Sequence, residues 1–173
     1  MEITKEQLLA IMPYARERAE VFLPYLNKYM TLYGICNRMR VRHFLAQIAH
    51  ESGELRYTKE LASGREYEGR RDLGNVKAGD GVRFKGRGLI QITGRCNYTR
   101  LSRSTDVDFV SNPQLLELPR WAVMSACWYW DVHGLNEPAD KVALTAITKK
   151  INGGTNGLQE RLKYLSRAKK VIK

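Results

Sequence analysis

Apolar residues recur at helical spacing along most of the chain, a pattern that predicts a mainly helical protein. The clearest stretch follows Asn37, a residue type that caps helix N-termini. Its apolar positions lie at i, i+3, i+4, i+7 and i+8, and they are Val41, Phe44, Leu45, Ile48 and Ala49. A Ser-Gly pair at positions 52–53 is expected to end this helix. Glu51 then lies at the C-terminal end of the helix, on its buried side.

Further helices are predicted on both sides of this one. Thr4 and Gln7 form a capping box before the apolar residues 8–12. Pro13 suits the first turn of a second helix, Pro24 is expected to break or restart it, and Gly34 to end it. Downstream, helical patterns begin near residue 94, cover 121–130, resume after residue 136 and run from about 158 to 172.

The helical period is absent from residues 62–88, where seven glycines occur. Asp80-Gly81 between short segments favours a β-hairpin. Residues 89–93 alternate apolar and polar side chains, so Gln91 and Thr93 are expected to share one face of a strand. The predicted fold class is therefore α+β, predominantly α-helical, with a small β-hairpin element.

Composition indicates one soluble domain covering residues 1–173. Apolar residues make up 43% of the chain and charged residues 27%. The longest apolar run, 121–130, is shorter than the roughly 20 residues that span a bilayer. The charged N-terminal segment does not resemble a signal peptide. Three cysteines, an odd number without a CxxC pair, fit a reducing compartment better than a disulfide framework or a metal site.

The net charge of +11 points to a polyanionic partner. Nucleic acid, an anionic bacterial envelope and an anionic membrane all qualify. Basic residues are concentrated near the C-terminus, where nine Lys or Arg and one Glu occur from residue 141 onward. Charge alone does not choose among these partners.

Two carboxylates are the best candidate for chemistry. His50-Glu51 begins the zinc-protease pattern HExxH, but Glu54 stands where that pattern needs its second histidine. No phosphate-binding or dinucleotide-binding glycine motif is present, and no metal or cofactor is expected. Glu51 and Glu60 remain, nine positions apart. Low dielectric and the negative end of the helix dipole disfavour ionisation of Glu51, as a general acid requires.

Neutral hydrogen-bonding side chains accompany this pair. They are Gln91, Thr93, Asn97 and Asn152. Amides and hydroxyls of this kind suit the recognition of sugars. Glu54, Glu66 and Glu68 lie close enough in sequence to compete with Glu60 for the role of base.

Taken together, four motifs resemble glycoside hydrolase family 19. They are AHESG at 49–53, KEL at 59–61, GDGVRFKGRGLIQITGRCNY at 79–98 and INGG at 151–154. That family comprises plant-type chitinases and bacteriophage endolysins. The segments ITKEQLLAIMP and YEGRRDLGN look closest to the phage and prophage branch. The resemblance covers about residues 44–164 and implies a lysozyme-like, two-lobed domain with a cleft between the lobes.

The resemblance also implies roles for individual residues. Glu51 would be the general acid that protonates the glycosidic oxygen, and Glu60 the base that activates water in an inverting hydrolysis. Thr93 would help to hold that water. The substrate-binding residues would be Gln91, Asn97, Tyr98 and Asn152, and Glu68 is a further candidate near the cleft. His50 and Arg161 would support the site, with Arg161 paired to Glu51.

The sequence therefore predicts an endolysin that hydrolyses the β-1,4 bonds of bacterial peptidoglycan. We expect a monomer without a separate wall-binding domain, held in the host cytoplasm until the membrane is permeabilised. Its partners would be peptidoglycan glycan strands and the anionic envelope, not nucleic acid. Two alternatives remain: a chitinase of the same fold, and a non-enzymatic basic module that binds cell wall or nucleic acid.

Overall fold

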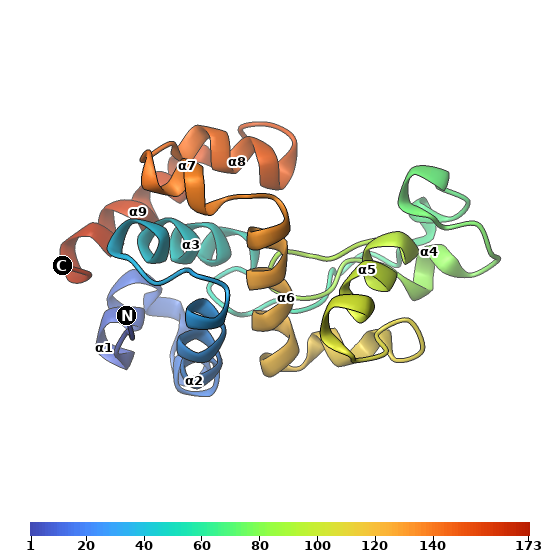
Figure 1. Ribbon diagram of the computed structural model, residues 1–173, viewed down its shortest axis with the longest axis horizontal. Coiled ribbons are helices and arrows are strands. Elements are labelled where there is room, and N and C mark those ends of the chain that lie inside the picture. Colours follow the sequence, from blue (N-terminus) through green and yellow to red (C-terminus); the bar gives the residue numbers. More distant parts are fainter.

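A computed structural model describes all residues, 1–173, and it is built almost entirely of helices (Figure 1). The α-helices are α1 (Lys5–Ile11), α2 (Glu17–Leu32), α3 (Arg38–Glu51), α4 (Asp80–Arg83), α5 (Arg95–Thr105), α6 (Pro119–Val132), α7 (Asn136–Asp140), α8 (Leu144–Asn152) and α9 (Leu158–Val171). Four short 3₁₀ helices are η1 (Pro13–Ala15), η2 (Arg65–Tyr67), η3 (Arg71–Leu73) and η4 (Pro113–Glu117). The prediction of a predominantly helical fold is confirmed.

Helix α3 lies at the centre of the main group of helices. It packs most extensively against α9, and Figure 1 shows it between α1 and α2 on one side and α7 and α8 on the other. All five residues of its predicted apolar face are buried. His43 and Gln47 are buried as well, so α3 is enclosed nearly all round. The C-terminal end of this helix, which carries Glu51, is therefore held on a rigid element.

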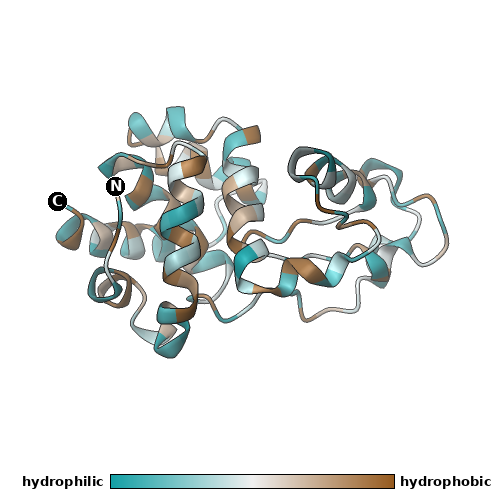
Figure 2. Ribbon diagram, turned by 60° about the horizontal axis from the view of Figure 1, so that its bottom comes forward, coloured by the Kyte–Doolittle hydropathy of each residue, from teal (hydrophilic) through white to brown (hydrophobic).

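Helix α6 stands between this helical group and the part of the chain that contains α4 and α5 (Figure 1). Its residues 122–128 are all buried, and Trp130 meets Phe44 of α3 edge to face, with ring centroids 5.4 Å apart. Figure 2 shows both apolar and polar residues along most helices, as expected where one face meets the core. The hydrophobic core extends from Ile3 to Ile172. None of the helices combines the length and the apolar character needed to cross a membrane.

Local capping signals identified helix starts correctly, whereas one proline was misread. Thr4 and Gln7 form the predicted capping box, and the Asn37 side chain accepts a hydrogen bond from the Arg40 amide. Pro24, however, does not break α2, which continues through it. Pro24 and Glu20 are both exposed, so the Glu20 carbonyl that loses its helical donor faces water.

The predicted β-hairpin at Asp80-Gly81 is wrong, because these residues begin α4. The positive φ of +85° falls one residue earlier, at Gly79. The Asp80 carboxylate is buried, accepts a hydrogen bond from the Lys77 amide and pairs with Arg95 of α5 at 2.5 Å. This tertiary ion pair ties the turn to α5 instead of to a neighbouring strand.

The strand predicted over residues 89–93 is also wrong, and the chain contains only isolated β-bridges. Arg87 pairs with Ile92 and with Lys59, while residues 88–91 form a turn. Gly88 and Gln91 have φ angles of +88° and +50°, which a strand does not accommodate. The α+β assignment is therefore corrected to a helical fold with irregular connecting segments.

Buried His43 gives a testable pH dependence of stability. Both of its ring nitrogens lack a hydrogen-bond partner. Burial, followed by the charges of Lys169 and Arg42, lowers the pKa of His43 to about 4. Between about pH 4 and 6.5 the unfolded chain binds a proton that the folded chain does not, so the folded state is destabilised as pH falls through that window.

We expect His43 to reduce the free energy of unfolding by about 3 kcal/mol between pH 7 and pH 4. His43→Leu removes the titrating group and should flatten that slope. Urea unfolding of both proteins at several pH values measures it. Equal slopes for wild type and variant would contradict this explanation.

Candidate active site

Glu51 at the end of α3 is held by a buried cation from α9. Arg161, of whose side chain 1% is exposed, donates from Nη2 to Glu51 Oε1 at 2.5 Å. Its Nη1 donates to Gln47 Oε1 at 2.5 Å, and Gln47 in turn donates to Thr148 of α8. Because Gln47 and Glu51 are one turn apart on α3, a single guanidinium binds side chains from two successive turns of that helix. The Glu51 side chain remains 19% exposed, so a ligand can reach it.

The loop after α8 joins the same group of residues. Asn152 accepts a hydrogen bond from the Gly154 amide and donates to the Asn156 carbonyl, both at 2.8 Å. That carbonyl also accepts from Arg161 Nε at 3.4 Å. Burial and the charge of Glu51 raise the pKa of Tyr129, whose hydroxyl donates to the Lys150 carbonyl at 3.0 Å. The structure therefore brings Glu51, Arg161 and Asn152 together.

His50 lies beside this group and contacts the start of α9. Its Nδ1 lies 2.5 Å from Glu160 Oε2. A side chain at Gly157 would place its Cβ 2.1 Å from the His50 ring, and Gly157 has a φ of +70°. Only glycine permits this approach. His50 thus fixes α9 next to Glu51, in keeping with a supporting position.

The Glu60 carboxylate is held by one backbone amide and one tyrosine hydroxyl instead of a cation. The Glu60 amide donates to the Gly86 carbonyl at 2.9 Å, and Glu60 Oε2 accepts from the Gly86 amide at 2.6 Å. Tyr67 donates to Oε1 at 3.3 Å, and burial together with the Glu60 charge raises the pKa of Tyr67. A Cβ at Gly86 would lie 2.8 Å from Glu60 Oε2 and 2.6 Å from Gln91 Oε1. A side chain at position 86 would therefore displace the Glu60 carboxylate and the Gln91 amide from this arrangement.

Three polar residues that were predicted to accompany Glu60 are linked through side chain–backbone hydrogen bonds. They are Gln91, Thr93 and Asn97. Gln91 donates to the Gly88 carbonyl, Thr93 donates to the Gln91 carbonyl, and Asn97 donates to the Thr93 carbonyl. Gln91 Oε1 is buried and has no hydrogen-bond partner in the chain. Such an acceptor is costly unless a ligand or water meets it. The predicted polar residues around the base candidate thus lie together.

Two other predicted site residues are engaged by the protein itself. Tyr98 is fully buried and donates to the Lys85 carbonyl, and burial raises its pKa to about 12. The Tyr98 side chain therefore supports the glycine-rich segment from the side of the core, where a ligand does not reach it. Glu68 accepts from the amides of Gly79 and Gly81. Its two oxygens anchor the start of α4, and a role of Glu68 near the cleft stays a prediction.

Two salt bridges close to Glu60 in the chain were not predicted from the sequence. Glu117 of η4 pairs with Arg87 at 2.8 Å and with Lys59 at 3.2 Å. These two basic residues adjoin Gly86 and Glu60 in sequence, so Glu117 fixes the register between the two segments. No local signal marks Glu117, which lies 57 residues after Glu60.

Glu51 and Glu60 therefore have separate sets of partners, which sit at the two ends of the segment 52–59. None of the pockets in the structure is lined by either glutamate, so the two lobes with a cleft between them stay a prediction. No group of three or more His, Cys, Asp or Glu side chains is placed to hold a metal ion.

Comparisons with known proteins identify the class to which this site belongs. A family model described as chitinase class I, of glycoside hydrolase family 19, matches residues 36–153. A Haemophilus influenzae protein described as a glycosyl hydrolase family 19 domain-containing protein is 33% identical over 163 residues, covering 75% of this chain and 78% of that protein. An Arabidopsis thaliana endochitinase is 28% identical over 136 residues, covering 78% of this chain and 47% of the relative. The chain thus spans about half the length of that plant protein.

Among solved structures, chitinase C from Streptomyces griseus superposes with a TM-score of 0.80 at 19% identity, covering 98% of this chain and 76% of that one. The family match supports a glycosidase. The chain belongs to glycoside hydrolase family 19 and has the predominantly helical, lysozyme-like fold of that family.

Removal of the Arg161 side chain should destabilise the fold. Arg161→Ala leaves Gln47 and Glu51 without their buried donor, so we expect a loss of about 3 kcal/mol in the free energy of unfolding. Arg161→Lys should recover only part of this, since one ammonium does not reproduce the fork between two acceptors. Urea denaturation measures both. Lys163→Ala, an exposed position on α9, is the control, and equal effects of Arg161→Ala and Lys163→Ala would contradict the assignment.

Proposed function

We propose that the protein hydrolyses β-1,4 glycosidic bonds of bacterial peptidoglycan, with Glu51 as general acid and Glu60 as general base. The proposal rests chiefly on one observation. The two family-motif glutamates have different partners, a buried guanidinium for Glu51, and one backbone amide and a tyrosine hydroxyl for Glu60. Glycoside hydrolysis needs two carboxyl groups in different environments, because one must donate a proton and the other must accept one.

In the proposed reaction, Glu51 gives its proton to the glycosidic oxygen as the bond between that oxygen and the sugar C1 breaks. Water between the sugar and Glu60 loses a proton to Glu60 and bonds to C1 from the opposite face. Thr93 and the unpartnered Gln91 oxygen would orient the water and the sugar. Inversion of this kind needs carboxyl groups about 6.5–9.5 Å apart.

Arg161 has a defined place in this cycle. A close cation favours the ionised carboxylate, so Arg161 stabilises the form of Glu51 that remains after the proton is donated. Substrate must therefore weaken the contact between Glu51 and Arg161 before the reaction. Exclusion of water from Glu51 by a bound glycan would act in that direction, because desolvation disfavours the charged form.

The net charge of +11 supports an anionic polymer as substrate. Peptidoglycan carries carboxylates, whereas chitin is neutral. We further propose an endolysin role for a monomer that acts on the cell wall after release from the host cytoplasm. The second candidate function is hydrolysis of chitin, which the likeness to an Arabidopsis endochitinase favours. Side-by-side assays on chitin oligomers and purified peptidoglycan separate the two, and a clear preference for chitin would reject the endolysin role.

Substitution of either glutamate by glutamine should abolish most hydrolysis. We expect Glu51→Gln and Glu60→Gln each to lose on the order of 10²-fold or more in rate, from loss of acid or base catalysis. Glu66→Gln, at an exposed position six residues beyond Glu60, is the matched control and should retain activity.

Mass spectrometry of muropeptides released from purified peptidoglycan is the readout, and the new reducing sugar names the bond that is cut. Full lysis by Glu51→Gln would overturn the catalytic proposal and favour a module that acts through charge alone.

A further inference from the structure

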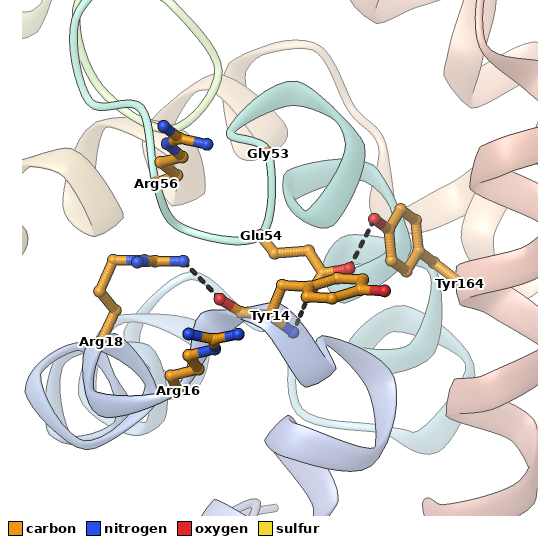
Figure 3. Close-up of a pocket in the computed structure, with 7 residues that line it drawn as sticks. All are labelled: Tyr14, Arg16, Arg18, Gly53, Glu54, Arg56 and Tyr164. Carbon is orange, nitrogen blue, oxygen red and sulfur yellow. Dashed lines mark hydrogen bonds between the residues drawn. The ribbon is translucent and has the colours of Figure 1, made fainter.

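A pocket of about 460 Å³ is lined in part by residues from the segment 53–56, which follows Glu51 in the sequence. Three arginines contribute to its walls (Figure 3). Its lining residues include Tyr14, Arg16, Arg18, Glu54, Arg56 and Tyr164. They come from the start of α2 and the preceding η1, from the segment after α3, and from α9. The pocket is separate from every residue that the proposed catalytic steps use.

The single acid in this pocket is already satisfied by the protein. Glu54 is 4% exposed, accepts from the Tyr14 amide at 2.6 Å and accepts from the Tyr164 hydroxyl at 2.9 Å. Burial and this hydrogen bond to Glu54 raise the pKa of Tyr164, which keeps the hydroxyl protonated as a donor. Both carboxylate oxygens of Glu54 are thus occupied by hydrogen-bond donors of the protein itself.

The three arginines have no acidic partner. None of Arg16, Arg18 and Arg56 takes part in any ion pair of the structure. Arg18 donates from Nη2 to the Tyr14 carbonyl at 2.5 Å, but its Nε is buried without a partner. Figure 3 shows the three guanidinium groups on one side of Glu54, with the Tyr164 ring on the other.

The backbone at Arg16 is unusual in the same place. Arg16 has φ and ψ of +50° and −127°, a conformation that favours glycine. Strained backbone of this kind persists where surrounding contacts impose it, and it is concentrated at binding sites. An arginine at such a position places its guanidinium at the pocket, where a glycine would place nothing.

The pocket also adjoins the proposed acid. Glu51 and Glu54 are three residues apart, so their Cα atoms are separated by no more than about 11 Å. Arg161 and Tyr164, one turn apart on α9, bind Glu51 and Glu54 respectively. A glycan bound at Glu51 could therefore extend a substituent into the pocket.

We infer that the pocket formed by Arg16, Arg18 and Arg56 binds a carboxylate on the peptide substituent of a peptidoglycan strand, an inference that rests on the proposed function. The three guanidinium groups line one pocket without an acidic partner, and a guanidinium matches the planar, bidentate geometry of a carboxylate. Chitin has no group of this kind. The pocket would therefore make the enzyme favour a peptide-bearing glycan over a neutral one.

A direct binding experiment tests the inference without catalysis. Glu51→Gln protein is titrated with a muramyl dipeptide that has a free carboxylate, with the same compound as its amide, and with glycerol phosphate, and amide shifts are followed by NMR. The free carboxylate should bind at least 10-fold more tightly than the amide, with shifts at Gly53 and Tyr14. Binding should weaken about 10-fold in Arg16→Gln/Arg56→Gln, which leaves Arg18 on the Tyr14 carbonyl.

Arg38→Gln/Arg103→Gln is the matched control, because both side chains are exposed, lie outside the pocket and carry the same total charge. Equal weakening by the two double variants would overturn the inference and leave only long-range attraction. Equal binding of the amide would overturn it too. Binding of glycerol phosphate in place of the dipeptide would also overturn it, in favour of a phosphate polymer.

An activity ratio extends the test to the polymer. Rates are measured on intact peptidoglycan and on peptidoglycan whose carboxyl groups have been converted to amides. The ratio of the two should fall about 10-fold in Arg16→Gln/Arg56→Gln and stay at the wild-type value in the control, and an unchanged ratio in both would contradict the inference. If wild type does not cut peptidoglycan but still binds the free dipeptide selectively, the proposed function fails while the carboxylate site stands.

Discussion

The contact of Arg161 with Gln47 and Glu51 joins the C-terminal half of α3 to α9, and the candidate site depends on it. A buried guanidinium is costly unless its donors are met, and here two turns of α3 and the loop after α8 supply the acceptors. The pairing of α3 with α9 and the position of Glu51 are therefore set by one and the same group. A substitution of Arg161 is therefore expected both to lower the free energy of unfolding and to displace the Glu51 side chain.

Glu60 depends on a different kind of constraint. It lies on an irregular segment with no helix to orient it, and both its backbone amide and its carboxylate are hydrogen-bonded to Gly86. Glu117 holds the two segments in register through Arg87 and Lys59. The Glu60 carboxylate thus takes its hydrogen bonds from the Gly86 amide and the Tyr67 hydroxyl, and not from a cation.

Local sequence signals predicted the helices well because their causes are local. Thr4 and Asn37 cap helices through contacts within three residues, and the apolar face of α3 follows from its period. The hairpin and the strand failed because distant partners decided those segments. Asp80 is bound to Arg95, and the Gly88 amide donates to Thr58. A turn signal at Asp80-Gly81 carries no information about an arginine on a later helix.

The candidate site divides in the same way. Motif resemblance singled out Glu51, Glu60 and Arg161, and the structure places Arg161 on Glu51 as that resemblance implies. Gln47 and Glu117 were missed, since the contacts that give them meaning span 114 and 58 residues. The arginine pocket escaped notice for the same reason, because its walls come from both ends of the chain. Tyr98 shows the converse, a motif residue that packing directs into the core.

The central claim is that Glu51 and Glu60 act from opposite faces of one sugar, with water beside Glu60. The anomeric form of the first product tests it most directly. Proton NMR recorded within the first minutes of hydrolysis of a soluble β-1,4 glycan fragment distinguishes the two anomers before they interconvert. We expect the α-anomer first, as inversion requires. Initial formation of the β-anomer would show retention and contradict the proposed arrangement of the two carboxylates.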